Sequence, residues 1–142
     1  MRTVLAVVLL IGFTFGACAG SAVCRDISGQ IVDEADGEAR WQDDSFNNKA
    51  LLTYTWDAST GSARLVSKDD TNVGGEVKTH SGLAFEYDDN VTIVIRLAHA
   101  TWLHTLYPET GKVLVTQHTN LGPLAPQKLS GLMMVGQCHF GS

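Results

Sequence analysis

The chain has 142 residues, of which 44% are hydrophobic and 18% are charged, a balance typical of one globular domain with one hydrophobic core. Fifteen acidic residues against ten basic ones give a formal net charge of −5. This balance argues against nucleic-acid binding and against charge-driven binding to an anionic membrane surface, because both depend on patches of Lys and Arg.

The N-terminus predicts export. Met1 and Arg2 precede an apolar run over residues 4–15, and small residues follow, which is the three-part pattern of a secretory signal peptide. The apolar run is shorter than the roughly 20 residues that a membrane-spanning helix needs. Cleavage after Ala19 would remove residues 1–19 and leave one β-domain over residues 20–142, with a net charge of −6 because Arg2 is lost.

A second form of processing is also open. The run Phe15-Gly16-Ala17-Cys18 resembles a bacterial lipobox, in which Cys18 becomes the lipidated first residue of the mature protein. The protein would then be tethered to the membrane through Cys18. With ordinary signal cleavage it would be periplasmic or secreted.

Either form of processing leaves Cys24 and Cys138 as one pair near the two ends of the mature chain. Because exported proteins fold in an oxidising compartment, we expect these two residues to form a disulfide. The alternative, two thiols that bind a metal or act as nucleophiles, lacks a CxxC partner near either cysteine.

The mature chain is predicted to be all-β, because runs rich in β-branched and aromatic residues recur and hardly any segment shows a sustained helical period. Gly29 is expected to form a bulge in the first strand, and Ser81-Gly82 a turn between two short strands. Residues 33–49 are acidic and polar, which predicts a long loop, with one helical turn at most, that carries Trp41 and Phe46 into the core. The predicted strands are residues 24–32, 50–56, 62–67, 76–80, 83–87, 91–97, the two arms of a hairpin within 100–119, and 128–140.

Eight or nine short strands at regular spacing predict a small antiparallel β-barrel of about eight strands. A disulfide between the first and last strands would suit a sheet that closes on itself and leaves no exposed edge. A two-sheet β-sandwich is the alternative.

The hairpin over residues 100–119 is the element that the sequence predicts in most detail. Pro108 presets the first corner of a turn and Gly111 supplies the positive φ at its end, so Tyr107 is expected to face Lys112. Neither face of the hairpin is purely polar, which is typical of a hairpin in the centre of a sheet. Counting outward from the turn predicts the pairs Leu106–Val113, Thr105–Leu114, His104–Val115 and Trp102–Gln117.

No pattern in the chain predicts a metal, a cofactor or a set of catalytic residues. Of the five histidines, His104 and His118 fall on opposite faces of the hairpin, and no HxH or HxxxH pair supplies two ligands from one element. The carboxylate pairs Asp43-Asp44, Asp69-Asp70 and Asp88-Asp89 lack the spacing of a calcium loop and predict solvated turns. Phosphate-binding loops, dinucleotide-binding fingerprints and nucleophile elbows do not occur.

Aromatic side chains are the best pointer to binding, because one or two of them often line the mouth or interior of a barrel. Packing in the core is the alternative role for each. The candidate binding aromatics are Trp41, Tyr54, Trp56, Trp102 and Tyr107.

The run STGSARLVS over residues 59–67 resembles the SGxRY-type inhibitory segment of the membrane-bound lysozyme inhibitors of the C type. These are small exported β-rich proteins with one cysteine near each mature end. The likeness covers nine residues, has Leu65 where that family has Tyr, and does not continue after Gly75. It therefore implies an analogy of layout alone.

These features together favour a non-catalytic, exported protein of the cell envelope that binds a protein partner or a small apolar ligand through loops or a barrel cavity. One alternative is an envelope hydrolase whose histidine and carboxylate are brought together by the fold. The other is a structural component of an envelope assembly, which would show a flat apolar surface patch. No nucleic-acid partner is expected, and a membrane partner only if Cys18 is lipidated.

Overall fold

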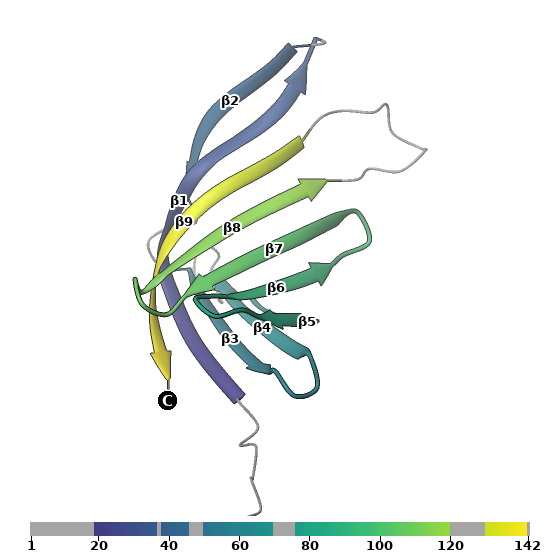
Figure 1. Cartoon of the computed structure of the whole chain (residues 1–142). Coiled ribbons are helices and arrows are strands. Elements are labelled where there is room, and N and C mark those ends of the chain that lie inside the picture. The colour runs from purple at the N-terminus through teal and green to yellow at the C-terminus, as the bar shows by residue number, and fades with distance from the viewer. Residues whose placement is uncertain (1–18, 37, 46–49, 70–75, 120–129, 142) are drawn as a thin grey trace, which may run out of the picture.

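The computed structural model describes residues 19–36, 38–45, 50–69, 76–119 and 130–141. These residues form nine strands and no helix, and eight of the strands close into an antiparallel barrel (Figure 1). The strands are β1 (Ala19–Ala35), β2 (Glu38–Ser45), β3 (Leu51–Asp57), β4 (Ser62–Asp69), β5 (Glu76–Glu86), β6 (Val91–Arg96), β7 (Ala100–Tyr107), β8 (Lys112–Thr119) and β9 (Ser130–Gly141). The predicted barrel is confirmed.

The barrel closes where β1 pairs with β9, and the predicted disulfide lies on this seam. Cys24 and Cys138 are direct cross-strand partners with their Cα atoms 4.1 Å apart, and their sulfur atoms are bonded. The bridge joins residues 114 positions apart. In the chain-entropy account, closing a loop of this length restricts the unfolded chain enough to stabilise the fold by about 4–5 kcal/mol.

Strand β1 changes neighbours half-way along its length. Residues 19–24 pair with β3, whereas residues 28–35 pair with β2, and β9 follows β1 through both halves. A β-bulge between Arg25 and Ser28 separates the halves, with Asp26 at a φ of 54°. The predicted bulge at Gly29 is therefore wrong. Gly29 serves close packing instead, since a Cβ atom there would collide with the Met133 carbonyl of β9.

We call residues 26–45 the flap, because here β1 and β2 continue beyond the ring of eight strands. In Figure 1 this part lies at the top, away from β3, β4 and β5. Within the described residues β2 pairs with β1 alone, so its other edge is open. All eight residues of β2 are exposed.

The flap corrects the prediction of a long loop over residues 33–49. Trp41, expected in the core, has 62% of its surface exposed, and Phe46 lies outside the described residues. The prediction failed because β2 has no buried face and therefore no alternation of apolar and polar residues. Backbone pairing with β1 holds it in place, and a sequence pattern does not report such pairing.

The predicted turn at Ser81-Gly82 is also wrong, because β5 is one continuous strand. Its first part pairs with β4 and its last residues pair with β6, and the change of neighbour falls beside Gly82. A Cβ atom at Gly82 would lie 2.6 Å from the Val94 carbonyl oxygen. This glycine allows a close approach between strands and does not make a turn.

The predicted hairpin is confirmed pair by pair. Tyr107 faces Lys112, and the four outer pairs have the expected partners. Gly111 has a φ of 64°, and its carbonyl accepts a hydrogen bond of 2.7 Å from the Cys138 amide of β9. The hairpin turn is thus tied to the strand that carries the disulfide.

Candidate functional site

The lumen is packed with buried side chains from all eight barrel strands. Among the described residues, eighteen hydrophobic ones have at most 9% of their surface exposed, and the largest fully buried side chains include Tyr54, Ile27, Leu65 and Ile93. One polar side chain, that of His104, is buried among them with no exposed surface. The described core therefore resembles the filled interior of a small barrel more than the cavity of a ligand carrier.

A hydrogen bond crosses this lumen. The Tyr54 hydroxyl lies 2.8 Å from His104 Nδ1, and the two residues belong to β3 and β7, on opposite sides of the ring of eight strands. Burial lowers the pKa of His104 to about 3, with a smaller contribution from the charge of His80, and burial raises the pKa of Tyr54. Both side chains are neutral at physiological pH, so no charge is buried.

The donor in the Tyr54–His104 hydrogen bond can be assigned by counting the polar groups that each arrangement leaves unpaired. Among the described residues, His104 Nε2 has no hydrogen-bond partner, and the same holds for Trp102 Nε1 on the stacked neighbouring ring. If the Tyr54 hydroxyl donates to Nδ1, one N–H of His104 stays unpaired. If Nδ1 donates instead, the Tyr54 hydrogen and the Nε2 lone pair are both unpaired. The first arrangement costs less, so His104 carries its proton on Nε2.

The structure divides the five candidate binding aromatics between the two sides of the barrel wall. Tyr54, Trp56 and Trp102 face the lumen, where the first two are buried and the third is half-buried. Tyr107 faces outward and is half-buried, and Trp41 projects from the outer side of the flap. The five do not form one site.

The most unusual surface lies outside the barrel, where two rows of residues cross β5, β6, β7, β8 and β9. We call these ten residues the apolar belt. The pairing of neighbouring strands places each row side by side. The first row is Leu83, Val94, Leu103, Thr116 and Met133, and the second is Phe85, Thr92, Thr105, Leu114 and Val135.

The belt contains no ionisable side chain and exposes large apolar groups. Leu83 is 58% exposed, Met133 52%, and Phe85 and Val135 45% each. The threonines pair with one another, since Thr92 Oγ1 lies 3.2 Å from Thr105 Oγ1. The outer wall of a water-exposed barrel ordinarily alternates polar residues with the buried ones, and this contiguous apolar surface departs from that pattern.

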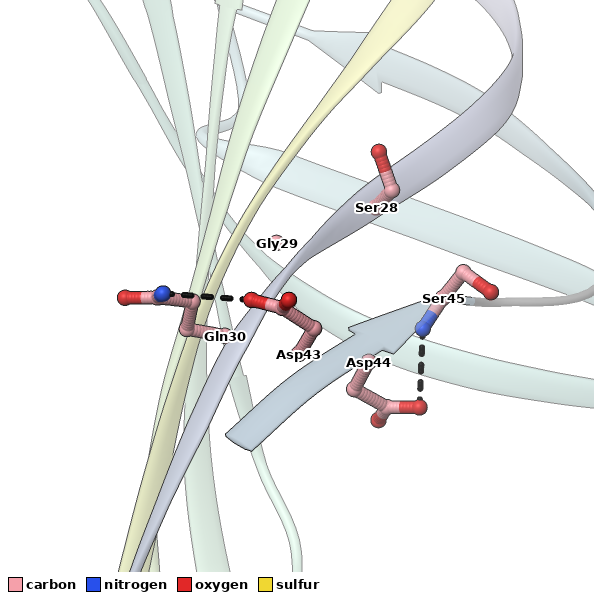
Figure 2. Close-up of a pocket in the computed structure, with 6 residues that line it drawn as sticks. All are labelled: Ser28, Gly29, Gln30, Asp43, Asp44 and Ser45. Carbon is pink, nitrogen blue, oxygen red and sulfur yellow. Dashed lines mark hydrogen bonds between the residues drawn. The ribbon is translucent and has the colours of Figure 1, made fainter. Parts of the chain in front are cut away.

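The belt leads into the flap. On the outer side, Met133 pairs with Gln30, and Gln30 pairs with Asp43 of β2. Figure 2 shows the Gln30 and Asp43 side chains meeting, with Gln30 Nε2 donating to Asp43 Oδ1 at 3.2 Å. Six residues of β1 and β2 line an open hollow of about 570 Å³ at this place, namely Ser28, Gly29, Gln30, Asp43, Asp44 and Ser45 (Figure 2).

The side-chain hydrogen bonds of His104 and His139 go to Tyr54 and to Arg25, not to a serine or a carboxylate. The described residues also contain no group of three or more His, Cys, Asp or Glu side chains placed to hold a metal ion. No helix in the described ranges is long and apolar enough to cross a membrane. Cys18, the candidate lipidation site, lies outside these ranges.

No protein-family model matches the chain, and no curated protein matches it either.

Sequence reasoning missed the belt, although its signal was present. The run VTIVIR of β6 is apolar on both faces, and so is much of the hairpin. Such a pattern is typical of a central strand that is buried on both sides. In a closed barrel one of those sides faces outward, so two-sided apolar character means that the outer wall is itself apolar.

Proposed function

We propose that the protein is a non-catalytic, exported protein of the cell envelope that binds another protein through the apolar belt. The supporting observation is the belt itself, a contiguous outer surface of five strands with four large apolar side chains about half exposed and no charge. Burying such a surface releases roughly 25 cal/mol for each Å² of apolar area removed from water. The signal-like N-terminus and the disulfide support an envelope location.

The belt favours a protein partner over a small ligand. A small ligand of a barrel is ordinarily enclosed by a concave cavity. Here the described lumen is packed with side chains, while the exposed apolar surface lies on the convex outer wall. A partner protein that lies across several strands can cover this convex apolar surface.

The negative charge of the flap favours a different protein over a second copy of this chain as the partner. The belt ends at β9, which pairs directly with the flap. The flap carries a net charge of −6, from seven acidic residues and one basic residue within residues 26–45. Two copies joined belt to belt would bring two acidic flaps together, and this repulsion opposes self-association.

A matched pair of variants tests the proposal. Val135 in the belt is 45% exposed, and Val23, outside the belt on the outer side of β1, is 40% exposed. Tagged wild-type protein, Val135→Lys and Val23→Lys are used to isolate complexes from envelope extracts. We expect one partner that the wild type and Val23→Lys bind equally and that Val135→Lys binds at least about tenfold more weakly, because a lysine would be buried in the contact.

Circular dichroism and thermal unfolding of the purified variants show whether each one folds. Equal binding by both folded variants, or no partner for the wild type, would overturn the proposal.

A further inference from the structure

The acidic charge of the protein is concentrated in one element. Residues 26–45 hold seven acidic side chains and one basic side chain, whereas residues 20–25 and 46–142 together hold eight of each. The net charge of the flap is therefore −6, and that of the rest of the expected mature chain is zero. Since charges on a surface act over about 8 Å at physiological ionic strength, a partner selected by this negative charge must come close to the flap.

The flap also carries an open strand edge. Within the described residues β2 pairs on one side alone, with an unbroken register from Ser28–Ser45 to Ala35–Glu38. It contains no proline and no bulge, two of the devices with which proteins block such edges. The N–H and C=O groups along its outer edge are thus placed to pair with one more strand.

The carboxylates at the end of β2 have no basic partner among the described residues. Asp43 accepts a hydrogen bond from Gln30, and Asp44 accepts one of 2.8 Å from the Ser45 amide (Figure 2). No Lys, Arg or His of the described chain lies within ion-pair distance of either carboxylate. A lysine or arginine on an added strand would complement them.

An exposed aromatic side chain stands beside this edge. Trp41 lies on β2 two residues before Asp43, on the same outer side as the belt, and is 62% exposed. Tryptophan is among the residues that contribute most to protein interfaces, so its exposure here fits a contact surface.

From these observations we infer that the open edge of β2 binds an extended, basic segment of a partner protein by strand addition. The backbone edge supplies the hydrogen bonds, and the acidic side chains select Lys and Arg in the segment. The inference rests on the proposed function in one respect, that the occupant is a protein. Its alternative is that the carboxylates protect the edge against any added strand.

The test uses the whole mature protein and two synthetic peptides. One is an acetylated seven-residue peptide of alternating lysine and valine, and the other has glutamate in place of lysine. Calorimetric titration measures affinity, and hydrogen exchange measures protection of the β2 amides. We expect the lysine peptide to bind and to slow exchange at alternate amides of β2, and the glutamate peptide not to bind.

Two variants with equal charge separate site-specific binding from bulk attraction. Asp43→Asn/Asp44→Asn removes two charges from the flap, and Asp88→Asn/Asp89→Asn removes two from the exposed turn between β5 and β6. We expect the first to weaken binding of the lysine peptide about tenfold or more and the second to have little effect. Equal weakening by both, or binding without protection of β2, would overturn the inference.

The outcome is independent of the belt experiment. If Val135→Lys loses the partner but the lysine peptide does not bind, the inference about the flap alone is wrong. If the peptide binds but Val135→Lys keeps the partner, the proposed function of the belt is wrong.

Discussion

Tyr54 and His104 form a buried hydrogen bond across the interior of the barrel. Their hydrogen bond of 2.8 Å joins opposite walls and satisfies one polar atom of each side chain. An imidazole at the centre of an otherwise apolar core costs free energy unless it is paired. The pair therefore predicts strong coupling between the two positions.

A double-mutant cycle measures this coupling. Tyr54→Phe leaves His104 Nδ1 without a partner and is expected to lower the free energy of unfolding by about 1–3 kcal/mol. His104→Leu leaves the Tyr54 hydroxyl unpaired, with a cost of similar size. The double variant removes both polar groups and should be much less destabilised than the sum of the two single variants. Additive costs in denaturant titrations would contradict the bond.

The same histidine predicts a pH dependence. Its pKa of about 3 in the folded protein is below the ordinary value of 6.5, so between these values the unfolded state binds more protons. Its contribution to stability is complete above pH 6.5 and falls as the pH decreases toward 3. Between pH 6.5 and 5 the wild type should lose about 1.5 kcal/mol more than His104→Leu. Parallel losses in the two proteins, measured by denaturant titration at each pH, would show that His104 does not titrate in this way.

At the scale of elements, the hairpin of β7 and β8 shows what local chemistry determines. Pro108 and Gly111 define the turn, and the turn defines every pair along both strands, so the register was predictable from sequence. The flap was not predictable, because β2 buries no side chain and is held by backbone pairing. The turn predicted at Gly82 was wrong because the sequence does not distinguish a glycine that allows two strands to approach closely from a glycine that forms a turn.

Gly111→Val tests the hairpin. A β-branched residue at a φ of 64° is strained, and its Cβ atom would also lie 3.3 Å from the Cys138 carbonyl oxygen. We expect the free energy of unfolding to fall by about 1–3 kcal/mol. Gly111→Asn is the control and should cost less, because asparagine adopts this region more readily. Equal stability of the two variants in thermal unfolding would mean that the turn is not under this constraint.

In the molecule as a whole, the barrel is a single layer of strands, and the residues on its inner side differ in role from those on its outer side. The inner side makes the core, and the outer side of β5 to β9 makes the belt. The spacing of the predicted strands favoured a small barrel with a two-sheet sandwich as the alternative, and the positions of Cys24 and Cys138 predicted the disulfide. They did not reveal the belt, because an apolar residue in the sequence does not say which side of the wall it lies on.

Reduction of the disulfide tests the closure of the barrel. Cys24 and Cys138 join the first and last barrel strands, so breaking their bond removes a link between residues 114 positions apart. Loss of a native disulfide from a small exported domain typically costs about 2–5 kcal/mol, and we expect a marked fall in melting temperature. Calorimetry with and without reductant is the measurement. An unchanged transition after confirmed reduction would show that the seam does not need the bond.

The central claim is that the apolar belt contacts another protein in the envelope. Its most direct test places a photoreactive amino acid at Leu83 or Phe85 in the belt, and at Val23 outside it, in cells that make the protein at its native level. We expect illumination to join a discrete protein to the variants that carry the probe at Leu83 or Phe85, and none to the variant that carries it at Val23. Equal adducts at all three positions, or none at the belt positions, would contradict it.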